Sequence, residues 1–306
     1  MGHEMLNSFP GSAMTLLWFP LALLCALALA TSDALTKKAL AGRDEVLILW
    51  LRFAVALPFL LASLLVIPIP VLAPGFWPAV VTALPLEMLA AFLYVRALKV
   101  SPLGLTLPFL AFTPVFLLVI PSLLLDERIT PAGGVGILCI AVGSYALNLK
   151  TVRQGFLAPF RAIGSEPGSR LMIAVAFIYS FTSTLGKKAI SCSSPLFFAA
   201  LYFSLLVIAF APIALWRGRR ELAPGSCRDT LRAALLPGIS YAVSIASHML
   251  AISMTQVAYM ISVKRLSLLF GVIYGHLLFN EPEIRERLLG TSLMLAGVML
   301  IVWSSV

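Results

Sequence analysis

A handful of ionisable residues interrupt otherwise apolar stretches of this chain, and their positions limit the chemistry they can perform. The adjacent Lys264 and Arg265 stand eight and nine residues into one apolar run, and Glu87 lies near the middle of another. A charge at the centre of a bilayer costs about 2.5–3.5 kcal/mol on insertion scales, so each of these residues needs a partner or a wet cavity. Their placement predicts a polar site inside an apolar molecule.

The Lys264–Arg265 pair has two interpretations. It could bind an anionic group of a solute, because a guanidinium makes bidentate contacts with carboxylate or phosphate and an ammonium acts as a point charge. Alternatively, the pair forms an internal ion pair with Glu87 that holds two parts of the protein together.

Glu87, His248 and Asp33 are the other candidates. Glu87 could contact solute, couple transport to proton movement or neutralise Arg52, which counting along the helices places at a similar depth. His248 lies at about the depth of the basic pair, where it is either a solute contact or an ordinary packing residue. Asp33 could line the mouth of a cavity and take part in coupling, or it could simply end a helix.

The composition explains why these residues stand out. Of the 306 residues, 60% are hydrophobic and 11% are charged, whereas a soluble domain has roughly 25% charged residues. Long apolar runs without period-2 alternation indicate membrane-spanning helices rather than a membrane barrel. We therefore predict an all-α integral membrane protein.

Ten apolar runs are long enough to be membrane spans. Residues 16–30 resemble the apolar part of a signal peptide, but no Lys or Arg precedes them and the run has a counterpart in the second half, so we expect a retained first helix. The predicted spans are 14–36, 45–67, 76–97, 102–125, 131–149, 170–190, 195–216, 231–253, 256–279 and 287–304.

The distribution of basic residues predicts an orientation. Most Lys and Arg residues fall in the loops after the odd-numbered spans, and few fall in the loops on the opposite side. The positive-inside rule then places both termini outside the cytoplasm. We expect a multi-pass protein of a prokaryotic inner (plasma) membrane.

The two halves of the chain repeat one another. A shift of 154 residues superposes 97–147 on 251–301 without a gap, and it matches Gly136 with Gly290 and Gly143 with Gly297. Lys37-Lys38 matches Lys187-Lys188 at an offset of 150. Each unit has five spans, an odd number, so the copies must be inverted in the membrane, which is typical of secondary transporters. The predicted repeats are 14–149 and 170–304, joined by a loop at 150–169.

On these features the chain resembles the EamA-type transporters of the drug/metabolite transporter superfamily. The resemblance rests on Leu51-Arg52-Phe53, Asp126-Glu127-Arg128, Asn280-Glu281, Ser262-Val263-Lys264-Arg265 and the glycine-spaced fifth and tenth spans, and it covers about residues 14–304. It implies a ten-helix carrier with a central cavity lined largely by spans 1, 3, 4, 6, 8 and 9. The superfamily handles amino acids, drugs, nucleotide sugars and sugar phosphates, and Lys264-Arg265 is similar to an adjacent Lys-Arg of its phosphate translocators.

The sequence argues against an enzyme. The only histidines are His3, His248 and His276, so no HExxH metalloprotease motif exists, and Gly186-Lys187 lacks the earlier glycine of a nucleotide P-loop. The four cysteines are scattered, and three of them lie in or beside apolar runs, which favours small core residues over disulfides or metal ligands. We expect no cofactor, no metal and no nucleic-acid partner. The expected partners are a small-molecule substrate and the lipid bilayer, and the protein is expected to be a monomer or homodimer. An anionic or phosphorylated solute is the favoured cargo, with proton-coupled export of drugs or amino acids as the alternative.

Overall fold

The computed structural model describes residues 17–101, 107–146, 167–223, 226–279 and 288–304, and every regular element in these ranges is helical. Most of the predicted connecting loop at 150–169, the Asn280-Glu281 pair and the first residues of the predicted first span lie outside the described residues.

Seven helical segments are long and apolar enough to cross a membrane. Large apolar side chains lie on the surface of the molecule. The exposed fractions of Leu65, Val71 and Trp303 are 89%, 95% and 76%. Such apolar surface is typical of a protein that faces lipid. The seven segments are α2 (Trp18–Ala39), α3 (Glu45–Ala62) with its extension to Leu65, α4 (Phe76–Val100), α11 (Pro167–Ser191), α12 (Pro195–Arg217), α13 (Cys227–Met254) and α14 with α15 (Val257–Leu278).

Three shorter apolar segments complete the bundle. The first is a broken segment made of the 3₁₀ turn η3 (Leu107–Ala111), α6 (Phe112–Phe116) and α7 (Ile120–Leu125). The other two are α8 (Pro131–Ala146) and α16 (Leu288–Ser304). Prolines have unequal effects here, because α4 continues through Pro85 while the segment that contains Pro114 and Pro121 is interrupted.

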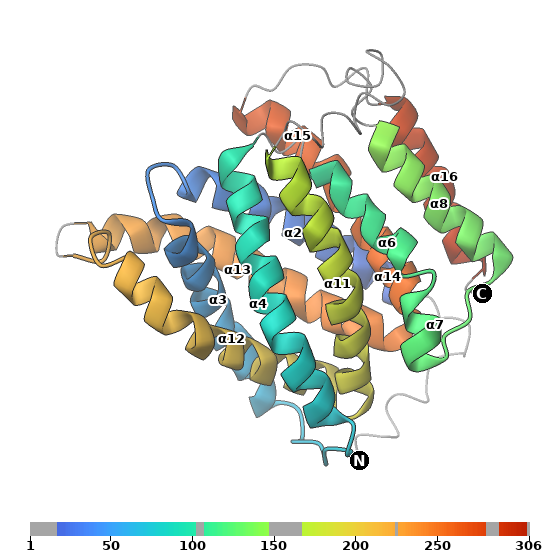
Figure 1. The fold of residues 1–306 in the computed structure, drawn as a ribbon, viewed down its shortest axis with the longest axis horizontal. Coiled ribbons are helices and arrows are strands. Elements are labelled where there is room, and N and C mark those ends of the chain that lie inside the picture. The colour runs from blue at the N-terminus through green and yellow to red at the C-terminus, as the bar shows by residue number, and fades with distance from the viewer. Residues whose placement is uncertain (1–16, 102–106, 147–166, 224–225, 280–287, 305–306) are drawn as a thin grey trace.

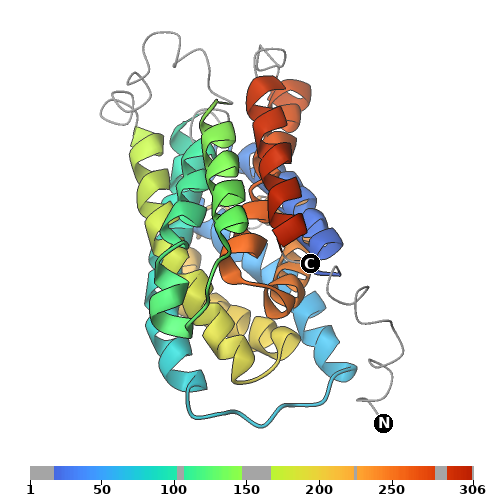
Figure 2. The same ribbon diagram turned by 90° about the vertical axis from the view of Figure 1, so that its right-hand side faces the viewer.

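The long helices of the first half pack against those of the second (Figures 1 and 2). α2 lies along α13, α4 lies along α11, and α3 packs against both α12 and α13. α4 and α11 are antiparallel, because the residues just before α4 meet the end of α11, where the Ala73 N–H donates to the Cys192 carbonyl at 3.0 Å. The core between them is formed by side chains from both halves.

α8 and α16 stand side by side at one edge of the bundle (Figures 1 and 2). Their backbones touch at glycines: a Cβ added to Gly136 would lie 2.7 Å from the Gly297 carbonyl oxygen, and one added to Gly143 would lie 2.7 Å from that of Gly290. The later residue of α8 meets the earlier residue of α16, so the two helices are antiparallel. Small residues permit this close approach. In lipid, where no hydrophobic driving force acts between helices, the resulting van der Waals packing stabilises their association.

Ion pairs join the helices at both ends of the bundle. Where α3 begins, Asp44 caps the helix by accepting from the Val46 N–H at 2.8 Å. There Glu45 contacts Lys99 at 2.6 Å, Arg96 at 3.0 Å and Arg217 at 3.3 Å. At the other end, the Lys187 ammonium of α11 lies 2.7 Å from Glu127, which also accepts from the Val257 N–H at the start of α14.

Candidate functional site

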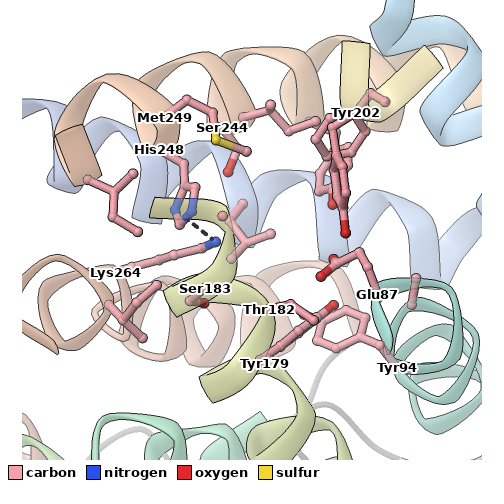
Figure 3. Close-up of a pocket in the computed structure, with 18 of the residues that line it drawn as sticks. Glu87, Tyr94, Tyr179, Thr182, Ser183, Tyr202, Ser244, His248, Met249 and Lys264 are labelled. Carbon is pink, nitrogen blue, oxygen red and sulfur yellow. Dashed lines mark hydrogen bonds between the residues drawn. The ribbon is translucent and has the colours of Figure 1, made fainter. Parts of the chain in front are cut away.

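A cavity of about 110 Å³ lies among the long helices of both halves. It has room for several water molecules, and its walls come from α2, α3, α4, η3, α11, α12, α13 and α14 with the residue that follows it. Figure 3 shows that polar groups gather at two places on its wall. The ionisable and hydroxyl-bearing lining residues are Arg52, Glu87, Tyr94, Tyr179, Thr182, Ser183, Tyr202, Tyr241, Ser244, His248, Lys264 and Arg265.

Lys264 and His248 form one of these places. The Lys264 Nζ lies 3.4 Å from His248 Nδ1 (Figure 3). Within the described ranges no carboxylate lies within ion-pair distance of Lys264. An ammonium that faces a cavity and has no carboxylate partner can bind an anionic group of a ligand.

Arg265 differs from its neighbour. It is 3% exposed, and its Nη2 donates to the Thr113 hydroxyl of α6 at 2.8 Å. Its Nε has no hydrogen-bond partner among the described residues. The side chain thus joins two segments of the bundle while the guanidinium still borders the cavity.

The basic pair stands at a break in its helix. α14 ends at Lys264, α15 begins at Ser267, and the turn between them carries short-range bonds such as Leu266 N–H to the Val263 carbonyl at 2.9 Å. No proline or glycine causes this break. The Ser262 hydroxyl donates to the Ala258 carbonyl at 2.6 Å, a bond of the kind that bends helices. The sequence predicted a continuous span here, and the interruption is a finding of the structure.

Asp33 and Arg52 form a buried ion pair. Asp33 Oδ1 lies 3.1 Å from Arg52 Nη2, and the Tyr94 hydroxyl donates to Asp33 Oδ2 at 2.5 Å. The Arg52 guanidinium also lies 3.8 Å from the centroid of the Tyr241 ring, a cation–π contact. α2 continues beyond Asp33 to Ala39, so Asp33 does not end the helix. Arg52 borders the cavity but Asp33 does not.

Glu87 forms the second polar place on the cavity wall. Figure 3 shows it beside Tyr94, Tyr179, Thr182 and Tyr202, and it lies within electrostatic range of Lys264. It makes no ion pair with any described residue. Neither pairing considered from the sequence, Glu87 with Arg52 or Glu87 with the basic pair, is present in this conformation. Arg52 is paired with Asp33 instead.

The polar groups of the cavity suit the binding of a polar solute. In the part of the chain that the structure describes, no group of three His, Cys, Asp or Glu side chains could hold a metal ion. All four cysteines are free. The cavity instead offers an ammonium, a carboxylate and several hydroxyls, which are groups that recognise a polar solute.

The sequence profile of the EamA-like transporter family matches residues 16–149 and again residues 167–303, which together make up most of the chain. The chain belongs to the EamA-like transporter family. It is thus a multi-pass membrane protein from a family of transporters, and the resemblance drawn from the sequence is confirmed. No curated protein matches it. A solved crystal structure is 18% identical in sequence, with a TM-score of 0.68, and the match covers 94% of this chain and 98% of the other. At that identity the likeness concerns the fold alone.

For this EamA-family chain, sequence reasoning missed the aromatic wall of the cavity. Tyr94, Tyr179, Tyr202 and Tyr241 all border it. Tyr94 and Tyr179 lie close together, with ring centroids 6.3 Å apart. A tyrosine inside a membrane span is itself a signal, because a buried phenol hydroxyl needs a polar partner. The sequence offered that signal at all four positions.

Proposed function

We propose that the protein is a secondary transporter that carries a small solute with an anionic group by alternating access. In this proposal ten spans form two inverted five-helix repeats, and Lys264 holds the anionic group in the cavity. Both termini lie outside the cytoplasm of a prokaryotic plasma membrane, and one chain or a homodimer is the functional unit. The following observations support it.

The glycine contacts between α8 and α16 support an inverted repeat. The 154-residue shift makes Gly290 the counterpart of Gly136 and Gly297 the counterpart of Gly143. In the structure Gly136 meets Gly297, and Gly143 meets Gly290. Gly136 therefore touches the counterpart of Gly143, and Gly143 touches the counterpart of Gly136, which is the contact pattern of a two-fold axis. Since the two helices are antiparallel, such an axis would lie in the membrane plane.

Two lysine contacts support the same symmetry. Lys37 donates to the Ser101 carbonyl at 2.9 Å, and its counterpart Lys187 donates to the carbonyl of Thr255, the counterpart of Ser101. The Lys37 contact lies where α4 ends, because Ser101 directly follows α4, and Lys99 in the last turn of α4 contacts Glu45 there. The Lys187 contact lies near the end of α11. Because α4 and α11 are antiparallel, the two contacts lie at opposite ends of the bundle, as inverted repeats require.

Discontinuous helices at matching positions support a solute site. The η3 turn at Leu107–Ala111 corresponds by the same shift to residues 261–265, where α14 ends. The bond from Arg265 to Thr113 joins these two interrupted segments. In transporters with inverted repeats, broken helices in corresponding positions of the two halves mark the binding site.

The single observation that carries the anionic solute is the unpaired ammonium of Lys264 at the cavity. Its neighbour in the cavity is an imidazole, 3.4 Å away, rather than a carboxylate. A cation kept in the interior at a cost in desolvation is best explained by a ligand that compensates the charge. The alternative is proton-coupled export of drugs or amino acids through Glu87, which the position of that carboxyl group at the same cavity favours.

A thermal-unfolding panel on the purified, detergent-solubilised chain tests the proposal. Carboxylates and phosphate monoesters are compared with choline as a cation and glucose as a neutral solute, in the parent and in Lys264→Gln. A bound anion at about 100 times its dissociation constant should stabilise the parent by roughly 2.7 kcal/mol. We expect Lys264→Gln to lose this stabilisation. Lys188→Gln is the matched control, because Lys188 is exposed and does not border the cavity.

Two results would overturn the role of Lys264. Anions could stabilise Lys264→Gln as much as the parent, in which case the anion lies elsewhere. Choline alone could stabilise the parent, which would favour export through Glu87 instead.

A further inference from the structure

A second pocket, of about 510 Å³, lies at the end of the bundle where α3 begins and where α4 and α12 end. It is larger than the central cavity and distinct from it, because no residue lines both. Basic residues outnumber acidic ones on its wall, so positive charge is in excess there. The basic lining residues are Arg43, Lys99, Arg217, Arg219 and Arg220, and the acidic ones are Asp44 and Glu221.

Contacts between the two halves of the chain hold the walls of this pocket together. The Asp44 N–H donates to Glu221 Oε1 at 3.1 Å, and Arg217 Nη2 lies 2.7 Å from Asp44 Oδ2. The Lys99 ammonium donates to the Arg43 carbonyl at 2.9 Å. The second oxygen of Glu221 is buried. Both carboxylates are thus engaged within the wall.

Arg219 and Arg220 are not engaged in this way. Both are exposed, in the turn that follows α12, and neither makes an ion pair with a residue in the described ranges. On the opposite wall, Arg43 donates from Nη1 to the Ala39 carbonyl at 3.0 Å, which leaves other N–H donors of its guanidinium for a ligand. Guanidinium groups bind phosphate in bidentate geometry, so this cluster favours a phosphate group.

The pocket lies at the boundary between lipid and water. Its residues stand at the ends of three segments that are long and apolar enough to cross a membrane. In the last turns of α12, Ile213, Leu215 and Trp216 are 49%, 48% and 69% exposed, and tryptophan is enriched at membrane–water interfaces. A phosphate in the pocket would therefore be at the depth of lipid headgroups, next to an apolar surface that acyl chains can cover.

We propose that this pocket binds the phosphate group of an anionic phospholipid, with Arg43, Arg219 and Arg220 as its contacts and the acyl chains along the exposed apolar side of α12. Basic pockets between transmembrane helices bind anionic headgroups in other membrane proteins. Arg43 belongs to the first half of the chain and the other two arginines to the second, so the bound lipid joins the halves at this end of the bundle. The proposal is independent of the solute in the central cavity.

Native mass spectrometry of the purified full-length chain in detergent tests the proposal. Phosphatidylglycerol is compared with phosphatidylcholine of the same acyl chains, because the choline cation cancels the charge of the phosphate. We expect the parent to bind phosphatidylglycerol about tenfold more tightly than phosphatidylcholine, and Arg219→Gln/Arg220→Gln to lose this preference. The comparison of the two lipids is made first in the parent, so it does not depend on the folding of a variant.

Arg228→Gln/Arg232→Gln is the matched control. It removes the same charge from two exposed residues near the start of α13 that do not line the pocket. They lie at the same end of the bundle, where the Thr230 hydroxyl donates to the Glu221 carbonyl at 3.2 Å. The control should keep the preference for phosphatidylglycerol. Equal losses in the two double variants would mean that general surface charge attracts the lipid, and the proposed site would be wrong.

Glycerol 3-phosphate and inorganic phosphate distinguish a lipid from a soluble phosphate. Neither should displace phosphatidylglycerol at equal concentration, because neither has acyl chains to cover α12. Displacement by either compound would show that the pocket takes a soluble phosphate, and the lipid proposal would fail. It would also fail if the parent bound both lipids equally. None of these results bears on Lys264, whose test is thermal stabilisation by soluble anions.

Discussion

Two cationic centres, Arg52 and the adjacent Lys264 and Arg265, lie in the interior of the bundle, and among the described residues only Arg52 has a carboxylate partner. Arg52 is paired with Asp33 at 3.1 Å and stacks on Tyr241. Lys264, by contrast, has His248 as its one side-chain partner at hydrogen-bonding distance in the part of the chain that the structure describes. The desolvation free energy of a buried charge is thus compensated by a carboxylate at one centre and is not compensated by a carboxylate at the other.

This difference separates structural charge from charge available to a solute. Breaking a buried ion pair leaves its remaining member uncompensated, which is costly. Removing a buried charge that has no partner relieves the protein of a desolvation cost instead. Substitutions at the two centres should therefore act on stability in opposite ways, which makes the comparison measurable without knowledge of the solute.

The largest effect is expected from Asp33→Asn. The substitution keeps the shape of the side chain and leaves the Arg52 charge buried without its carboxylate, at an expected loss of about 3–5 kcal/mol in the free energy of unfolding. Unfolding in a denaturing detergent titration measures it. The double variant Asp33→Leu/Arg52→Met should recover most of the loss, because it removes both charges. A loss below about 1 kcal/mol in Asp33→Asn, at the low end of point-mutation effects, would show that the pair is not structural.

Lys264→Met is expected to have a smaller effect and to differ in sign from the loss at Asp33. Removal of the ammonium costs one long hydrogen bond to His248 but relieves the burial of a charge, so we expect the free energy of unfolding to equal that of the parent or to exceed it by up to about 1 kcal/mol. Arg52→Met is the matched control, because it leaves Asp33 as the unpaired charge. Equal losses in the two variants would contradict the distinction between the centres.

Much of the architecture follows from the sequence, because its signals survive without tertiary information. Apolar length predicts helices, and the order of polar and glycine positions predicts two repeats. The residues chosen for their cost in lipid, Lys264, Arg265, Glu87 and His248, all border one cavity. Their roles in binding and coupling stay predictions.

The partners of these residues could not be predicted, and the reason is physical. Counting along a helix gives depth in the membrane, and by depth Glu87 suited Arg52, whereas the structure pairs Arg52 with Asp33. Counting does not give the direction in which a side chain points around the bundle. In a soluble helix an apolar stripe reveals that direction, but lipid is as apolar as a packed interior, so the helices here are apolar on every side. The break after Lys264 was hidden for a similar reason, because the contact that accompanies it, Arg265 with Thr113, joins segments far apart in sequence.

Lys187→Met extends the comparison to a charge near water and is expected to cause a much smaller loss than Asp33→Asn. The Lys187 and Glu127 side chains are 21% and 11% exposed, so solvent and salt screen the pair more than they screen Arg52 and Asp33. Glu127 also keeps its bond from the Val257 N–H when the lysine is removed. We expect a loss of about 1 kcal/mol that shrinks as the salt concentration rises, measured by the same detergent titration at low and high salt. Lys188→Met, at the exposed neighbouring lysine, should change stability by less than about 0.5 kcal/mol at either salt concentration. A loss at Lys187 as large as that at Asp33, and insensitive to salt, would mean that water does not reach this end of the bundle. The ordering by burial would then be wrong.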